Sequence, residues 1–346
     1  MSITSKPNPT VVSLFAGCGG SSLGYKQAGF DIRLAVEWDT GAANVYRRNF
    51  PETNVFEGDI ADLTAEEALR AATLEPGELD VLDGSPPCQG FSTAGRRKFS
   101  DTRNRLFEEY VRMLEVFRPK MLVMENVSGL RKGKMKLIFA EMTRALKGAK
   151  YKVSCRELNA WWYGVPQDRR RLIWVGVRED LAAVPGHPEP TVTVPVSAGR
   201  ALGIDGTQSP ISIDTNHYNH AEDWKPIAGV VGVLRTKQKP RIIGVLADSW
   251  KRAEPSQNLQ KKPSWVGSFH SYRLNPHEIS PTMIKSVKHW DWREPRHLTI
   301  EECKILQGFP EWFEMYENEY KFLGNSVCPP MAEAIGRHLV ALLGEA

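Results

Sequence analysis

The chain has 346 residues, of which 41% are hydrophobic and 25% charged, a composition typical of a globular protein with one large domain and a smaller one. It contains no apolar run near the roughly 18 residues of a membrane-spanning helix, and its N-terminus lacks the layout of a signal peptide, so we expect a cytoplasmic protein without membrane contact. The five cysteines are widely spaced without a Cys-x-x-Cys pair. They disfavour a disulfide framework and a metal site, and they favour a reducing compartment.

The net charge of +4 is small, but its distribution is uneven. The stretch from Arg96 to Lys136 has twelve Lys or Arg against five Asp or Glu, and the stretch from Arg235 to Lys262 has eight against two. Two basic stretches in a balanced chain suit a polyanionic partner. Solvated helix faces are the alternative for each stretch taken alone.

Short apolar runs alternate with amphipathic stretches through the first half of the chain. Strands are predicted at Val11–Phe15, Ile32–Val36, Val81–Leu82, Met121–Met124, Tyr151–Leu158 and Arg171–Val177, and helices at Ser21–Ala28, Ala65–Leu74 and Leu106–Phe117. This alternation predicts an α/β domain with a mostly parallel sheet of the Rossmann-like type.

The character of the sequence changes near residue 180. Residues 184–210 are rich in Pro, Gly, Thr and Ser, and β-prone runs follow at Val230–Leu234 and Ile242–Leu246. We interpret this part as a smaller, loop-rich domain that contains β-structure. Helical patterns return at Thr299, where Thr299 and Glu302 form a predicted capping box, and the chain closes with a predicted helix at Pro330–Leu343.

These patterns divide the chain into three segments. They are 1–182 for the α/β domain, 183–297 for the smaller loop-rich domain, and 298–346 for a C-terminal helical segment.

A glycine-rich turn, Gly17-Cys18-Gly19-Gly20, follows the first predicted strand. A doubly wound fold binds nucleotide-like ligands at this place. The spacing lacks the third glycine of the dinucleotide fingerprint, which disfavours plain NAD binding. Ordinary turn glycines are the alternative reading.

Two acids after this turn suit an adenosine. Glu37 ends the next predicted strand and could bind both ribose hydroxyls, and Trp38 beside it could stack on adenine. Asp59 lies at another predicted strand end, where it suits the adenine amino group. With no phosphate-binding lysine, this set fits adenosine without pyrophosphate, and S-adenosylmethionine is such a ligand.

The segment Gly84-Ser85-Pro86-Pro87-Cys88-Gln89-Gly90 follows a predicted strand. Its prolines fix φ and remove two N–H donors, so Cys88 lies in a stiff loop. An aimed thiol of this kind suggests a covalent nucleophile. A buried small apolar residue is the alternative.

Charged residues lie at two other strand ends. Glu125 follows the predicted strand of residues 121–123, at the sheet edge where α/β sites form. Arg169 and Arg171 precede another strand and alternate so as to share one face. A salt bridge is the alternative for Glu125, and a phosphate-binding or exposed turn is the alternative for the arginines.

Taken together, these motifs resemble the DNA (cytosine-5)-methyltransferases along nearly the whole chain, except about 180–290, the variable target-recognition region of that family. The matching pieces are Phe15-Ala16-Gly17-Cys18-Gly19-Gly20, Glu37-Trp38, Gly58-Asp59-Ile60, Pro86-Pro87-Cys88-Gln89-Gly90-Phe91-Ser92, Glu125-Asn126-Val127, Gln167-Asp168-Arg169-Arg170-Arg171, Arg296-His297-Leu298-Thr299, Leu306-Gln307-Gly308-Phe309-Pro310 and Gly324-Asn325-Ser326-Val327. One departure is Glu301, where the family often carries Arg.

The resemblance implies that 1–182 is a catalytic and cofactor-binding domain, 183–297 a target-recognition domain, and 298–346 a C-terminal segment that returns to the catalytic domain. It also implies a mechanism. Cys88 would attack C6 of a cytosine, Glu125 would act at N3, Arg171 would hold O2 and Arg169 would help to position the site. The methyl donor would be S-adenosyl-L-methionine, leaving S-adenosyl-L-homocysteine. The implied cofactor contacts are Phe15, Gly17, Gly19, Gly20, Glu37, Trp38, Asp59, Ile60, Pro87, Leu106, Asn325 and Val327.

The implied partner is double-stranded DNA, from which the target base must be flipped out. The loop from Ser92 to Arg105 would close over the DNA. Candidate DNA-binding residues are Gln89, Ser92, Arg96, Arg97, Lys98, Arg235, Lys237, Gln238, Lys239, Arg241 and Arg273. We expect a monomer of a prokaryotic or phage modification type, whose cognate restriction endonuclease need not bind it.

Two rival functions remain. A branch of the family methylates cytosine in tRNA and carries Cys-Phe-Thr in its recognition region, but residues 180–290 contain no cysteine. A non-catalytic DNA-binding relative is expected to lose Cys88, Glu125 or the arginines, and all of them are present.

Overall fold

The computed structural model describes residues 7–87, 105–203, 272–285, 289–291, 296–316 and 319–345. The chain forms two compact units. The first comprises Met1–Gly164, Arg169–Thr193 and Ser326–Ala346, and the second comprises Val165–Asp168 and Val194–Asn325. The second unit thus includes residues 165–168 and extends to Asn325, and the functional ranges expected from sequence stay a prediction.

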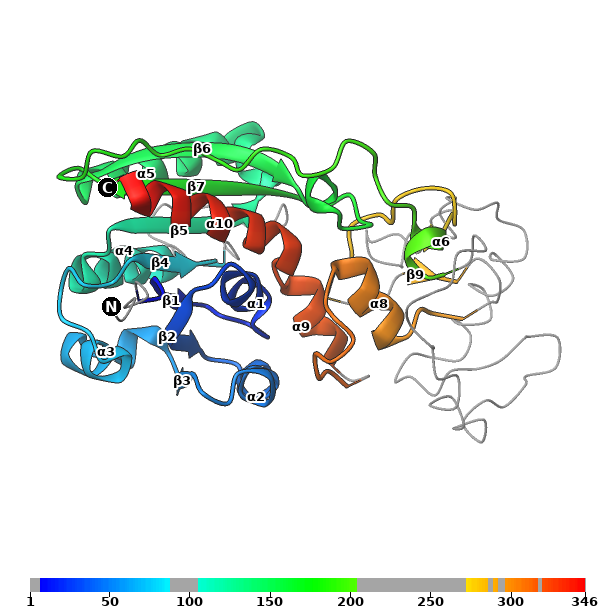
Figure 1. The fold of residues 1–346 in the computed structure, drawn as a ribbon, viewed down its shortest axis with the longest axis horizontal. Coiled ribbons are helices and arrows are strands. Elements are labelled where there is room, and N and C mark those ends of the chain that lie inside the picture. Colours follow the sequence, from blue (N-terminus) through cyan, green and yellow to red (C-terminus); the bar gives the residue numbers. More distant parts are fainter. Residues whose placement is uncertain are drawn as a thin grey trace, which may run out of the picture. The chain divides into compact units, whose positions relative to one another are not determined.

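A seven-stranded sheet forms the centre of the first unit (Figure 1). Its strands are β1 (Thr10–Leu14), β2 (Asp31–Glu37), β3 (Asn54–Glu57), β4 (Val81–Gly84), β5 (Met121–Val127), β6 (Tyr151–Asn159) and β7 (Arg170–Arg178). Their order is β3-β2-β1-β4-β5-β7-β6, and only β7 runs antiparallel to its neighbours. The predicted α/β class with a mostly parallel sheet is confirmed.

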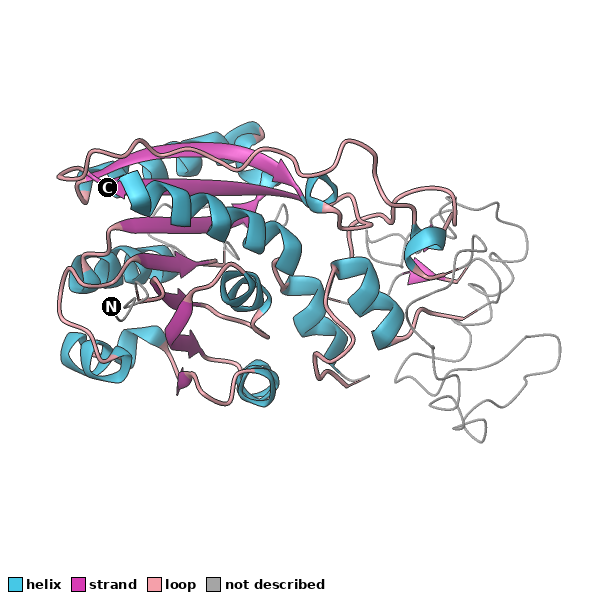
Figure 2. Ribbon diagram, in the orientation of Figure 1, coloured by secondary structure: helices cyan, strands magenta, loops and turns pink. Residues whose placement is uncertain are grey.

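Helices cover both faces of this sheet (Figure 2). They are α1 (Gly20–Gln27), α2 (Thr40–Asn49), α3 (Ala65–Ala72), α4 (Arg105–Phe117), α5 (Lys136–Gly148) and α10 (Pro329–Glu345). Short 3₁₀ helices lie at Ile60–Asp62, Ser128–Arg131, Gly133–Met135 and Ala160–Tyr163. Along each strand the side chains alternate between the faces, so each face has its own set of residues.

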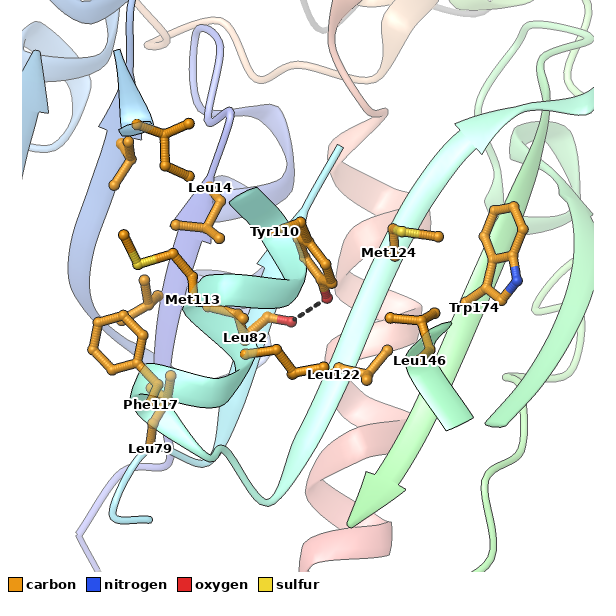
Figure 3. Packing of buried hydrophobic residues seen from close by; sticks show 14 of the residues in the cluster. Leu14, Leu79, Leu82, Tyr110, Met113, Phe117, Leu122, Met124, Leu146 and Trp174 are labelled. Atoms are coloured by element: carbon orange, nitrogen blue, oxygen red, sulfur yellow. Dashed lines mark hydrogen bonds between the residues drawn. The ribbon is translucent and has the colours of Figure 1, made fainter. Parts of the chain in front are cut away.

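One hydrophobic core lies between the sheet and helices α3, α4 and α5. Leu82, Leu122 and Trp174 enter it from successive strands, and Tyr110 enters it from α4 (Figure 3). The Tyr110 hydroxyl donates to the carbonyl oxygens of Leu82 at 3.3 Å and Val123 at 3.0 Å. This helix therefore fixes the carboxyl end of β4 against that of β5.

Helices α1 and α10 pack closely against each other, because each has a glycine at the contact. A Cβ atom added at Gly24 would lie 2.5 Å from the Cβ of Ala332, and one at Gly336 would lie 2.7 Å from that of Ala28. Larger side chains would force the helices apart. The C-terminal helix thus supports the helix that follows the glycine-rich turn.

The second unit contains α6 (Ala198–Ala201), α8 (Ile300–Gln307), α9 (Tyr320–Asn325) and a parallel pair, β8 (Tyr272–Arg273) and β9 (His289–Trp290). Helix α8 begins with the predicted capping box of Thr299 and Glu302, which is confirmed. Gln167 donates to the Leu306 carbonyl at 3.1 Å and the Gln307 side chain at 2.7 Å. This buried amide fastens residues 165–168 to α8.

The predicted β-prone runs Val230–Leu234 and Ile242–Leu246 lie outside the described residues. Within the described part of the chain, no helix has the length and apolar character needed to cross a membrane.

Candidate active site

The glycine-rich turn connects β1 to α1 through backbone conformations that favour glycine. Phe15, Gly17 and Gly19 have φ values of 56°, 57° and 93°. A Cβ atom at Gly19 would lie 2.4 Å from the Phe50 ring, so no other residue fits there without rearrangement. Gly20 is the first residue of α1. The turn therefore presents the positive end of the α1 dipole and leaves space above its backbone.

Glu37 holds this turn in place. Its Oε2 atom accepts from the Gly17 N–H at 2.8 Å, and its Oε1 atom accepts from the N–H groups of Trp38 at 3.0 Å and Asp39 at 2.9 Å. Burial raises the pKa of this carboxyl, and the three N–H donors oppose the shift. A carboxylate offers about four acceptor positions, so one remains for a ligand hydroxyl. The structural role was not apparent from the sequence.

The proposed adenine-binding side chains are at neighbouring strand ends. Trp38 is 73% exposed, which is unusual for a large apolar side chain. Asp59 is exposed and caps the 3₁₀ helix of Ile60–Asp62 by accepting from the Ala61 N–H at 3.0 Å, and Ile60 is buried. An exposed aromatic face beside an exposed carboxylate can bind a planar base with an amino group.

Phe15 and Leu106 are half-buried and pack against the core from β1 and α4. Pro87 is half-buried and is the last described residue before Cys88. These three therefore lie at the carboxyl end of the central strands, with part of each side chain accessible.

Contacts from β5 and α4 fix residues 84–86, which precede Cys88 in the sequence. The Asn126 amide donates to the Pro86 carbonyl at 3.0 Å, and a Cβ atom at Gly84 would lie 2.8 Å from the Tyr110 ring. The motif match contains Asn126 but predicts no role for it. Its place near the end of a strand, next to Glu125, is the sequence feature that points to a role in the site. Cys88 itself lies outside the described residues.

Glu125 and Arg171 form an ion pair at 2.8 Å between Oε1 and Nε, and each side chain is 13% exposed. The register of β5 and β7 sets Val127 opposite Arg171, so Glu125 is its diagonal neighbour on the same face. Glu125 lies inside β5, which extends to Val127, and not after the strand as predicted. The strand is longer because β7 pairs with it beyond Met124. Glu125 thus forms a salt bridge, whose partner is another candidate site residue, and its catalytic role stays a prediction.

Arg169 is fully buried beside this pair. Its Nη2 atom donates to the Ser326 carbonyl at 2.7 Å. Burial, reinforced by the charge of Arg171, lowers the pKa of its guanidinium to about 9. Arg169 thus anchors the segment that carries Val327, which is half-buried. Asn325 is exposed and ends α9 of the second unit.

The four described cysteines are poor nucleophiles. Burial raises the pKa of the Cys18 and Cys155 thiols to about 12 and that of Cys328 to about 11, and it also raises the pKa of Cys303. The thiolate is the reactive form, so these residues are inert at neutral pH. The part of the chain that the structure describes has no cluster of three or more potential metal ligands.

Most of the candidate DNA-binding residues lie outside the described residues. They are Gln89, Ser92, Arg96, Arg97, Lys98, Arg235, Lys237, Gln238, Lys239 and Arg241. Arg273 lies in β8 of the second unit.

Comparisons with known proteins agree with this arrangement. The family described as C-5 cytosine-specific DNA methylase matches residues 9–341. Type II methyltransferase M.XorII of Xanthomonas oryzae pv. oryzae is 32% identical over 376 residues, which cover 97% of this chain and 85% of the relative. Type II methyltransferase M1.HphI of Haemophilus parahaemolyticus is 31% identical, with 96% and 87% covered.

Solved structures show the same fold. A DNA modification methyltransferase encoded within an Escherichia coli prophage has a TM-score of 0.75 at 26% identity, with 97% of this chain and 100% of that chain covered. DNMT2 of Spodoptera frugiperda has a TM-score of 0.64 at 18% identity, with 97% and 100% covered, a likeness of fold alone. Because the family match and the relatives span nearly the whole chain, the protein belongs to the C-5 cytosine-specific DNA methylases and is a DNA (cytosine-5)-methyltransferase.

Proposed function

We propose that the protein transfers the methyl group of S-adenosylmethionine to C5 of a cytosine in a specific duplex DNA sequence, through covalent attack of Cys88 on C6. The observation that carries the proposal is the Glu125–Arg171 pair. The pair lies on β5 and β7, and β5 is the neighbour of β4, the strand that leads into Cys88. A carboxyl and a guanidinium held together, with a thiol supplied by the segment that follows β4, are the groups that this reaction needs.

The residues would act in sequence. The Cys88 thiolate forms a bond to C6, and the electrons of the C5–C6 double bond make C5 nucleophilic. Glu125 would share a proton with N3, and Arg171 would donate to O2, so that both stabilise the developing charge. Once C5 carries the methyl group, a base would remove the C5 proton, and the bond between Cys88 and C6 would break to restore the C5–C6 double bond.

The cofactor would bind at the glycine-rich turn. S-adenosylmethionine supplies an electrophilic methyl group when it is bound. The remaining acceptor position of Glu37 suits a ribose hydroxyl, and the exposed Trp38 face suits the adenine. The open space above Gly17, where an added Cβ atom would meet nothing within 4 Å, suits the rest of the ligand.

The four inert thiols also support Cys88 as the nucleophile, because it is the fifth cysteine of the chain. We predict that Cys88→Ser binds S-adenosylmethionine with wild-type affinity but incorporates no labelled methyl group into duplex DNA. DNA that contains 5-fluorocytosine should trap a covalent adduct with the wild type and none with the variant. Wild-type methylation by Cys88→Ser would refute the assignment.

The target is best identified in cells. Bisulfite sequencing of plasmid DNA from a host that expresses the chain is expected to give one methylated sequence context, with the position of the modified cytosine. A parallel incubation of the purified protein with duplex DNA and with tRNA tests the rival substrate. More methyl incorporation into tRNA would contradict the proposal.

A further inference from the structure

Asp83 is a buried acid that the proposed reaction does not use. It lies in β4, five residues before Cys88, and is 4% exposed. Its Oδ2 atom accepts from the Ser13 hydroxyl at 3.3 Å and its Oδ1 atom from the Tyr25 hydroxyl at 3.2 Å. The Ser21 hydroxyl also bonds to it. None of the ion pairs among the described residues includes Asp83, and its hydrogen-bond partners in that part of the chain are hydroxyl groups.

The three hydroxyls come from both sides of the glycine-rich turn. Ser13 is the direct partner of Asp83 in the register of β1 and β4. Ser21 and Tyr25 lie one turn apart on α1. The turn of residues 17–20 lies between Ser13 and Ser21 in sequence. One carboxylate therefore connects the strand before the turn, the helix after it and the strand that leads to Cys88.

A charge at this position is costly to the folded state. Burial raises the pKa of Asp83 to about 6, although the three hydroxyls oppose the shift. At neutral pH the carboxyl is therefore mostly ionised in a buried position where no described residue forms an ion pair with it, which disfavours folding. Buried charges that lower stability are found in proteins mainly at functional sites. A buried leucine or asparagine would fill this volume without the desolvation cost.

We propose that Asp83 is a positioning residue that couples the glycine-rich turn to β4, the strand that leads to Cys88, so that losing its carboxylate impairs cofactor binding and methyl transfer together. The inference rests on the proposed function of both segments. Two carboxylate oxygens accept hydroxyls from the two elements flanking the turn, and their loss leaves α1 free to shift relative to β4. A neutral amide can bond to both hydroxyls only if one of them becomes the acceptor, and it loses the charge that strengthens both bonds.

The test compares Asp83→Asn with the wild type at pH 7.5. Isothermal titration measures the Kd for S-adenosylmethionine, and labelled methyl transfer to duplex DNA measures kcat. We expect Kd to rise by roughly tenfold, as the loss of one hydrogen bond to a charged group implies, and kcat to fall at least as much. The melting temperature is expected to stay at or above that of the wild type. A purely structural role would lower the melting temperature and leave Kd unchanged.

Tyr25→Phe provides a second variant that keeps the packing and removes one hydroxyl. Its matched control is Tyr151→Phe, which removes a buried hydroxyl that donates to the Pro119 carbonyl at 2.7 Å. Tyr25→Phe should raise the Kd about threefold or more, in the range of one neutral hydrogen bond. Tyr151→Phe should lower the melting temperature and leave Kd and kcat unchanged.

The outcomes separate the two proposals. Wild-type Kd and kcat in Asp83→Asn would overturn the positioning role, as would equal effects of Tyr25→Phe and Tyr151→Phe. If Asp83→Asn does not fold, Tyr25→Phe and Ser13→Ala decide the matter, and unchanged Kd in both would overturn the proposal. Failure of the wild type itself to bind S-adenosylmethionine would refute the proposed function, and the inference with it.

Discussion

Single residues at the carboxyl end of the sheet carry the proposed chemistry, and the Glu125–Arg171 pair is the most direct of them. Each partner satisfies the other when no base is bound, so both side chains are held in one geometry before substrate arrives. Preorganised charges of this kind need little rearrangement during a reaction. Removing one partner would leave the other charge buried and unpaired.

We therefore predict that Glu125→Gln lowers kcat by about 10² to 10³, the usual loss for one preorganised stabilising group. The cofactor affinity should stay unchanged, because Glu37 and the glycine-rich turn are separate from the pair. Single-turnover methylation and cofactor titration measure the two quantities. Arg171→Lys keeps the charge but loses the planar fork, so it should retain more activity than Arg171→Ala. Equal activity in the two arginine variants would argue against a geometric role for the guanidinium.

Asp83 makes stability depend on pH in a defined direction. Its pKa is about 6 in the folded protein and 3.8 in the reference state, so the folded state binds the proton more tightly. This contribution to stability is fully present below pH 3.8 and is lost as the pH rises through about 6. The charged or titratable groups that act on Asp83, or that Asp83 acts on, are Glu125 on β5, Tyr25 on α1, Tyr46 on α2 and Tyr110 on α4.

Asp83→Asn should remove that dependence. A shift of about two pKa units corresponds to about 3 kcal/mol, so the variant should gain up to this amount over the wild type between pH 4 and pH 7.5. Urea unfolding at several pH values measures the difference. Parallel stability curves of variant and wild type over this range would contradict the raised pKa.

Among the elements, α1 and α10 show how small residues position a site. The close approach at Gly24 seats the C-terminal helix on α1, and the segment before α10 carries Ser326, to which Arg169 donates. We predict that Gly24→Ala lowers the free energy of unfolding by about 1 to 3 kcal/mol, in the range for overpacked sites. The control is Gly148→Ala in α5, where an added Cβ atom meets nothing within 4 Å. It should be neutral or stabilising, because alanine has the higher helix propensity. Thermal unfolding in both variants tests the contrast.

Most strands could be predicted from sequence, because β-branched and apolar runs such as Val11–Leu14 are buried on both faces. The end of β5 could not be predicted. Glu125 and Asn126 are polar, and only their pairing with β7 keeps them in a strand. The antiparallel direction of β7 depends on its short connection to β6, in which the 3₁₀ helix Ala160–Tyr163 lies. Tertiary pairing, and not local propensity, decided these features.

At the scale of the whole molecule, the motifs identified the candidate site, but their contacts could not be derived from them. The bond from Asn126 to Pro86 joins residues 40 positions apart, and the bond from Arg169 to Ser326 joins residues 157 positions apart. Such contacts depend on strand order and on where the chain passes between its two units. The sequence motifs therefore identify the site residues, but only the folded chain shows which residues they bond to.

Basic residues on the protein surface are expected to contribute to DNA affinity, because Lys and Arg bind the phosphates of duplex DNA. Arg131 and Lys132 are exposed directly after β5, the strand of Glu125. We predict that the variant with Arg131→Ala and Lys132→Ala binds duplex DNA more weakly at low salt. The plot of log affinity against log salt should become shallower by about 1 to 2, because each phosphate contact contributes about 0.9.

The control for this prediction is Arg70→Ala, which removes an exposed arginine on α3 that lies 3.9 Å from Glu66. Fluorescence anisotropy of a labelled duplex, measured between about 50 and 200 mM salt, gives the slopes. Over this interval the loss of affinity increases with the number of phosphate contacts. An unchanged slope in the double variant, or an equal change in Arg70→Ala, would mean that the basic residues after β5 do not contact the DNA backbone. A changed slope with unchanged cofactor affinity would assign them to DNA binding alone, because the proposed cofactor carries no phosphate.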